Sequence, residues 1–328
     1  MNIGKMFAIA VMSSLLSAGS AFACACGCCV FDIGGGTIMP VASDSGFSVW
    51  FRYAYMNQDQ LREGSSRANP SDNPDKQITT SFYIAGAEYR INHKWTVMAQ
   101  LPLYQRSFTT TDDGTYAAPA GTINTRHLTD LGDMLLRATY TGLSPDMTTG
   151  LSFGVKLPTG RYTSPTGPLG GSAFDRDTLP GTGSTDLVAA GYHVGKVSGS
   201  LGWFAQAQYQ FAIATRDDYR PGNELASALG LTYNFHANSH GMRISPTLHL
   251  IGSVRNHDSG GNADPDNTGY ERLLIAPGVQ LKASRKVSVY TDVEFPVAQH
   301  VRSAPVSSGV AGQLTAATLF KVQVNYGF

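Results

Sequence analysis

Side chains alternate in character along most of this chain, with an apolar or aromatic residue at every second position. From residue 47 to residue 55 the odd positions hold Phe47, Val49, Phe51, Tyr53 and Tyr55. Successive side chains of a β-strand point to opposite faces, so such a stretch predicts a strand with one apolar face. The pattern recurs and predicts twelve strands, at about residues 46–57, 78–92, 94–106, 130–141, 148–158, 185–195, 198–213, 224–236, 241–254, 270–283, 285–296 and 314–328.

The length of these stretches separates two kinds of β protein. Most run about 11–15 residues, whereas strands in soluble proteins are usually about 5–6 residues long. Tilted by about 40°, the longer strands cross the roughly 25 Å apolar band of an outer membrane. Without apolar helices, a chain crosses lipid only as a closed barrel. We therefore predict an all-β, antiparallel transmembrane β-barrel of outer-membrane type. A soluble β-sandwich is the alternative, and it would need a second sheet over each apolar face.

The connections between the predicted strands alternate in length. Short turns are expected near residues 92–94, 142–147, 196–197, 237–240 and 284. Long polar loops are expected near residues 58–77, 107–129, 159–184, 214–223, 255–269 and 297–313. Short turns on one side, long loops on the other and an even number of strands are typical of bacterial outer-membrane barrels. The even number also predicts that both termini of the barrel lie in the periplasm.

The first 23 residues have the pattern of a secretory signal peptide. Lys5 precedes a short apolar stretch at residues 6–16, and Ala21-Phe22-Ala23 forms a small-residue cleavage site. We therefore divide the chain into a cleaved signal peptide (1–23), a Cys-rich periplasmic segment (24–45) and the barrel (46–328). The expected location is the outer membrane of a Gram-negative bacterium, in contact with its lipid.

Charged residues within the predicted strands fall on the face opposite the apolar one. An Arg or Lys facing lipid at the bilayer centre costs about 2–4 kcal/mol, which explains the bias. Nine basic and four acidic residues share this inner face, so we expect a basic lumen that favours anions. The alternative is a wall network in which the acidic residues pair with their basic neighbours and select nothing. The candidate lumen-lining residues are Arg52, Arg137, Lys156, Gln206, Gln208, Gln210, Arg243, Arg272, Lys282, Asp292 and Glu294.

The sequence disfavours two other classes of function, nucleic-acid binding and catalysis. The 24 Lys and Arg residues are balanced by 24 Asp and Glu residues among 328, which disfavours a nucleic-acid-binding protein. The chain shows no Ser, His and acid set of the kind that outer-membrane enzymes place at the membrane rim, so we predict that it is not an enzyme.

Three internal motifs and the C-terminus resemble a known family. The motifs are Leu131-Gly132-Asp133-Met134, the segment 154–160 (GVKLPTG) and the segment 180–186 (PGTGSTD). They resemble the outer-membrane channel family named for the meta-cleavage (MetA) pathway of phenol degradation, and the resemblance covers about residues 45–328. It implies a porin-like channel for small, often aromatic, solutes. The terminal Tyr326-Gly327-Phe328 resembles the strand end that barrel-assembly machinery recognises, which implies that machinery as a partner through Phe328.

All four cysteines lie in a head that precedes the barrel, at Cys24, Cys26, Cys28 and Cys29. One hypothesis is a soft-metal site, since thiolates favour copper or zinc. Other hypotheses are disulfides, within the head or to a partner, and lipid attachment at Cys24. No C-x-x-C-H motif is present, so covalent haem attachment is not encoded.

Together these features predict a passive outer-membrane channel for small solutes, either hydrophobic and aromatic or anionic. Two alternatives keep the barrel but move the function elsewhere. In one, the barrel anchors a Cys-rich metal-binding or redox module with a periplasmic redox or metal partner. In the other, it sheathes an electron-transfer partner.

Overall fold

The computed structural model describes residues 46–235, 241–304 and 312–328. The predicted signal peptide and the Cys-rich segment, with all four cysteines, lie outside the described residues. The strands are β1 (Phe47–Glu63), β2 (Ser66–Arg67), β3 (Asp75–Arg90), β4 (Trp95–Thr111), β5 (Ile123–Leu131), β6 (Met134–Tyr140), β7 (Thr149–Leu157), β8 (Thr185–Lys196), β9 (Leu201–Ala214), β10 (Glu224–Tyr233), β11 (Arg243–Arg255), β12 (Tyr270–Lys282), β13 (Val287–Val301) and β14 (Gln313–Gly327). Two short 3₁₀ turns, η2 (Pro70–Asp72) and η3 (Arg176–Thr178), lie in the connections.

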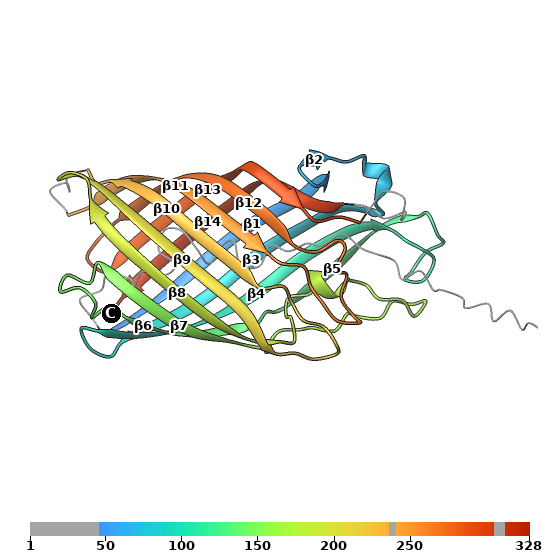
Figure 1. Cartoon of the computed structure of the whole chain (residues 1–328), viewed down its shortest axis with the longest axis horizontal. Helices are drawn as coiled ribbons and strands as arrows, with labels where there is room; N and C mark the ends of the chain where they lie inside the picture. The colour runs from blue at the N-terminus through green and yellow to red at the C-terminus, as the bar shows by residue number, and fades with distance from the viewer. Residues whose placement is uncertain (1–45, 236–240, 305–311) are drawn as a thin grey trace, which may run out of the picture.

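The strands form one closed antiparallel barrel (Figure 1). β14 pairs with β1, with Arg52 opposite Gln323 and Tyr55 opposite Phe320, and this seam removes the free edges of the sheet. β5 and β6 both pair with β4 and follow each other along one position of the wall. β2 is a two-residue strand that pairs only with the end of β1. The wall therefore has twelve strand positions, and the prediction of a twelve-stranded antiparallel barrel is confirmed.

The two ends of the barrel differ in their connections. The end that holds Phe47 and Phe328, here called the turn end, carries the short connection between β3 and β4 and those at residues 197–200 and 283–286. The opposite end, here called the loop end, carries the long connections 112–122, 158–184, 215–223 and 256–269. In Figure 1 the turn end is on the left, where the C-terminus is marked. No helix in the described ranges is long and apolar enough to cross a membrane.

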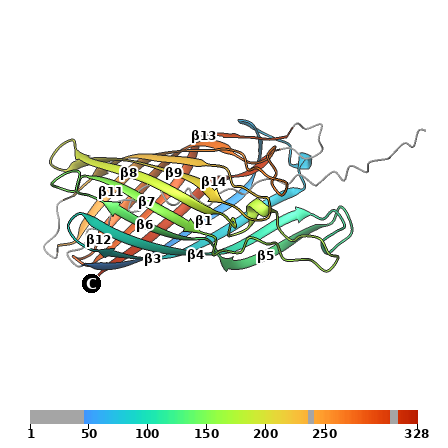
Figure 2. The ribbon, with the colours of Figure 1, turned by 60° about the horizontal axis from the view of Figure 1, so that its bottom comes forward.

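Several strands run further toward the loop end than the sequence predicts. β1 continues to Glu63, β4 to Thr111 and β13 to Val301. Most of β5 lies in a stretch predicted as loop, and Figure 2 shows it extending the wall toward the loop end. In these extensions polar residues occupy both faces, so the apolar alternation that marks the rest of each strand disappears.

Burial alternates along the strands as the apolar pattern predicts. In β1, Phe47, Phe51 and Tyr55 are exposed on the outer face. Their neighbours on the inner face are buried, including Trp50 and Arg52. The inner face is not uniformly polar, because a buried apolar cluster also lies within the barrel. Its largest members are Trp50, Met56, Phe82, Ile84, Tyr104, Tyr192, Phe204, Ile251, Leu274 and Leu319.

Candidate functional site: a plugged cavity at the loop end

The connection between β7 and β8, residues 158–184, folds back into the loop end of the barrel and is here called the plug. Its residues Ala173, Phe174 and Leu179 are buried at 2–3% exposure. They pack in one apolar cluster, in which the ring centroid of Phe174 lies 6.0 Å from that of Phe108. The other buried members of this cluster come from the wall and are Leu61, Ile78, Leu128 and Leu314.

Arg126 of β5 clamps the plug from the wall. Its Nη1 donates hydrogen bonds to the carbonyl oxygens of Ser172 and Ala173, at 3.3 and 3.0 Å. Its Nη2 pairs with the Asp112 carboxylate at 3.5 Å, and its guanidinium lies 4.0 Å from the centroid of the Tyr116 ring. A buried guanidinium with this many partners holds a backbone segment in one position. The plug is therefore fixed by polar contacts as well as by apolar packing.

Three glycines let the base of the plug approach the wall closely. A Cβ on Gly160 would lie 2.6 Å from the backbone carbon of Gly132, and a Cβ on Gly181 would lie 2.5 Å from that of Gly160. Real Cβ atoms do not come that close to backbone, so this stack accepts only glycine. Gly132 lies where β5 ends and β6 begins. The break in the wall therefore receives both ends of the plug.

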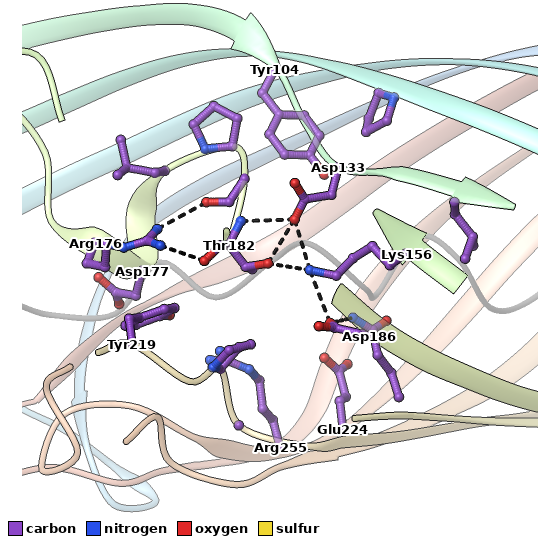
Figure 3. A pocket seen from close by; sticks show the side chains of 18 of the residues that line it. Tyr104, Asp133, Lys156, Arg176, Asp177, Thr182, Asp186, Tyr219, Glu224 and Arg255 are labelled. Atoms are coloured by element: carbon purple, nitrogen blue, oxygen red, sulfur yellow. Dashed lines mark hydrogen bonds and ion pairs between the residues drawn. The ribbon is translucent and has the colours of Figure 1, made fainter. Parts of the chain in front are cut away.

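Asp133 and Lys156 organise the polar contacts at this break (Figure 3). Asp133 accepts hydrogen bonds from the Gly160 amide at 3.0 Å, the Thr182 amide at 2.9 Å and the Lys156 ammonium at 2.9 Å. Lys156 also pairs with Asp186 at 3.1 Å and donates to the Thr182 hydroxyl. These residues come from all three motifs of the family resemblance, which the fold brings to one point. The motifs thus form the junction of plug and wall.

A cavity lies beneath the plug. Its volume is about 90 Å³. Part of its lining is apolar, from Ile84, Tyr104 and Leu135 of the wall and Leu179 and Pro180 of the plug. A site with a mostly apolar surface and a few placed polar groups is typical of small-molecule binding.

The charged groups around the cavity are close to balance. Lys156, Arg176 and Arg255 contribute positive charge, and Asp133, Asp177, Asp186 and Glu224 are the acidic groups. Most have partners, since Arg255 pairs with Asp258 at 2.5 Å and Glu224 accepts from the Tyr270 hydroxyl at 3.1 Å. In contrast, the Oδ2 atom of Asp177 is buried without a hydrogen-bond partner. Burial and the nearby Asp258 raise the pKa of Asp177 to about 8, against the opposing effect of Arg255.

The structure places most of the predicted lumen residues on the buried inner face. Arg52 is 1% exposed and donates to Gln323 at 2.9 Å, and Arg137 donates to Gln208 at 2.6 Å. Gln206 is also buried. Lys156 lies at the plug junction, where Gln210 donates to Asp186 at 2.7 Å.

The remaining predicted lumen residues divide between a wall network and the turn end. Asp292 and Glu294 lie 3.4 and 3.2 Å from the buried ammonium of Lys321. Arg272 is half-buried, with its guanidinium 3.8 Å from the Tyr270 ring centroid. Arg243 and Lys282 stand opposite each other near the turn end, and both are exposed.

The sequence pattern predicts neither the plug nor its acidic residues. Asp175, Asp177 and Phe174 lie in an aperiodic loop, and nothing in their order marks them as inward-facing. The available signal was the glycine spacing of Gly132, Gly160 and Gly181, which the sequence analysis tied only to the resemblance. Among the described residues, no group of three or more His, Cys, Asp or Glu side chains is arranged to hold a metal ion.

Comparisons with known proteins agree with the fold. No family model matches the chain, and no curated protein matches it. Among solved structures it is similar to the COG4313 outer membrane channel from Pseudomonas putida F1, with a TM-score of 0.65 and 12% identity over 90% of this chain and 100% of that one. It also matches the β domain of the Bordetella autotransporter BrkA (TM-score 0.49, 14% identity, 87% and 100% coverage) and the CymD monoaromatic hydrocarbon channel (0.46, 11%, 94% and 94%). The likeness to the first shows that this chain has the barrel fold of an outer-membrane channel.

Proposed function

We propose that this protein is an outer-membrane channel for the passive passage of small, uncharged and largely apolar solutes, aromatic ones included. The observation that carries the proposal is the plugged cavity inside a closed barrel. Its lining joins apolar side chains to ionic groups that mostly have partners, and it has room for one small molecule. Passage down a concentration gradient needs no chemistry.

The outer surface supports a location in the membrane. Large apolar side chains are exposed around the wall, including Phe153 at 61% and Leu229 at 55%. Contiguous apolar surface on this scale is unfavourable in water and suits the apolar band of a bilayer. By the usual arrangement of such barrels, the turn end lies in the periplasm and the loop end faces outward. We also propose that Phe328, at the turn end, is recognised during barrel assembly.

The charge distribution favours uncharged solutes over anions. The sequence predicts a basic lumen, but at the loop end several basic residues have acidic partners. Asp112 pairs with Arg126 and Asp258 with Arg255, while Asp133 and Asp186 share Lys156. Paired charges attract free anions weakly, so the selective feature of the cavity is its apolar lining.

Permeation into asymmetric vesicles with a lipopolysaccharide outer leaflet tests this function. We expect the protein to raise the permeability to benzyl alcohol more than that to benzoate. Ile84→Asp, which places a charge in the cavity, should reduce the gain. Val197→Asp is the matched control, since Val197 lies in a short turn outside the strands and is 62% exposed. No gain for either solute, or a larger gain for benzoate, would overturn the proposal.

The hypotheses about Cys24, Cys26, Cys28 and Cys29 concern residues outside the described ranges and remain separate from the channel. Replacement of all four cysteines by serine distinguishes them. A channel whose function lies in the barrel keeps its permeability, whereas a metal-binding or redox module loses its response to copper, zinc or oxidant.

A further inference from the structure

The plug carries two carboxyl groups whose charge is not compensated within the plug. Asp175 and Asp177 flank Arg176 in η3, and each has a buried Oδ2 atom without a hydrogen-bond partner. Arg176 is engaged elsewhere. Its guanidinium donates to the carbonyl oxygens of Gly181 and Thr182, at 3.3 and 2.6 Å, and lies 4.4 Å from the Tyr219 ring centroid.

The surroundings of these carboxyls are also acidic. Asp175 faces Asp75 of β3, Arg126 of β5 and Asp264 of the connection between β11 and β12. Asp177 faces Asp258 and Asp264 of the same connection, together with Arg255 of β11.

The two arginines in this region already have acidic partners. Arg126 pairs with Asp112, and Arg255 pairs with Asp258. Carboxyl groups therefore outnumber the basic groups available to them. Ionised Asp175 and Asp177 would repel the wall on which the plug sits.

Protonation removes that repulsion. Burial and the neighbouring carboxylates raise the pKa of Asp175 well above its ordinary value, and the same causes raise the pKa of Asp177. A buried carboxyl without partners is far less costly when neutral than when charged. The seated plug is therefore the form in which these groups hold their protons.

We propose that the plug is an acid-closed gate, which seats while Asp175 and Asp177 are protonated and leaves the loop end when they ionise. This regulation rests on the proposed channel function. The junction at Asp133, Lys156 and Thr182 stays attached as a pivot, because its charges are paired with each other. The part that moves is the segment around Phe174 and η3. Apolar packing, the Arg126 clamp and the contact of Arg176 with the Tyr219 ring hold it in place, together with backbone hydrogen bonds from residues 169 and 171 to residues 116 and 115.

The sign of the pH dependence follows from the difference between the pKa of Asp177 in the seated and in the unseated plug. The unseated plug exposes Asp177 to water, where its pKa returns toward the ordinary value of 3.8, whereas the seated plug holds it near 8. Between these values the unseated form gains about tenfold per pH unit for each such carboxyl, and the gain ends above the higher value. Opening therefore increases as pH rises and levels off above about pH 8.

Single-channel recording across pH 5 to 9 tests the gate. We expect the open probability of the full-length protein to rise at least about tenfold between pH 6 and pH 8. The double variant Asp175→Asn/Asp177→Asn should stay closed across the range, since it mimics the protonated groups. Asp113→Asn, in an exposed position of another loop, should behave like the parent protein. A flat pH profile in the parent, or an unchanged rise in the double variant, would overturn the gate.

A shortened plug separates failure of the gate from failure of the channel. The Gly181 amide donates to the Arg161 carbonyl at 2.8 Å, so a Gly-Gly turn between them can replace residues 162–180. This variant should conduct at every pH. If it conducts while the parent shows no pH dependence, only the gate is wrong. If a correctly folded short-plug barrel is silent, the channel function fails and the gate with it.

Discussion

The carboxylate of Asp133 and the ammonium of Lys156 lie 2.9 Å apart at the point where β5 gives way to β6. Both side chains are largely buried, and both also bind Thr182 of the plug. A break in a barrel wall exposes backbone groups that lipid cannot satisfy. Here the two ends of the plug, at Gly160 and Gly181, fill the break. The same contacts that repair the wall therefore hold the loop that closes the lumen.

Lys156→Met should destabilise the barrel at this junction. The substitution leaves Asp133 and Asp186 buried near each other without the ammonium they share, and breaking a buried ion pair in this way costs about 3–5 kcal/mol. We expect a lower unfolding temperature in heat-modifiability gels and a larger conductance. Lys94→Met, at an exposed position of the turn end, should change neither.

Gly160→Val should prevent the plug from reaching the wall. The Cβ of the added side chain would meet the backbone of Gly132 at 2.6 Å, a contact that no rotamer change can relieve. Limited proteolysis should cut the plug of this variant and spare that of the parent. Gly199→Val is the control, since a Cβ there meets nothing within 4 Å. Equal protease resistance in both variants would contradict the close approach.

Phe174→Ala should loosen the segment of the plug that packs on Phe108. Truncating a buried phenylalanine costs about 3–5 kcal/mol in a well-packed site. The loss should appear as faster hydrogen exchange in residues 161–181 and as a higher open probability. Leu169→Ala removes a side chain of the same loop that is 58% exposed, and its exchange should match that of the parent.

The connection between β4 and β5, residues 112–122, should be sensitive to strong acid because of Asp112. Burial acts to raise its pKa, but hydrogen bonds from the amides of Gly114, Ala117 and Tyr116 and from Asn124 outweigh it and lower the pKa to about 2. A lowered pKa stabilises the folded loop above the ordinary value of 3.8, and this contribution is lost as pH falls toward 2. After correction for the intrinsic pH dependence of amide exchange, exchange in residues 112–122 should therefore increase as pH falls below about 4. Asp112→Asn should remove that acid-dependent increase.

The alternation of side chains was enough to predict the barrel, its strand number and the two kinds of connection. One face of each strand meets an apolar medium, so every second residue of the strand has to be apolar. The same reasoning missed β5, because its sequence from Ile123 to Leu131 mixes polar and apolar residues on both faces. The inner face was predicted from its charged and polar residues, so buried apolar residues on that face, such as Phe82 and Ile84, were not predicted.

The plug could not be predicted because its position depends on long-range contacts. Phe174 is held by Phe108, and Arg126 reaches the plug from β5, far away in sequence. Lys156 was predicted as a lumen residue from its parity alone. Its partners Asp133 and Asp186 are 23 residues before it and 30 after it, and only the closed barrel brings them together. The expected basic lumen likewise ignored acidic residues that the loops carry inward.

The most direct test of the whole account is the single-channel conductance of the parent protein and of the short-plug variant, in the same bilayer at pH 7. The account predicts rare, small openings for the parent and stable, larger conductance steps for the variant. Equal conductance in the two proteins would show that residues 158–184 do not close the lumen, and it would contradict the account.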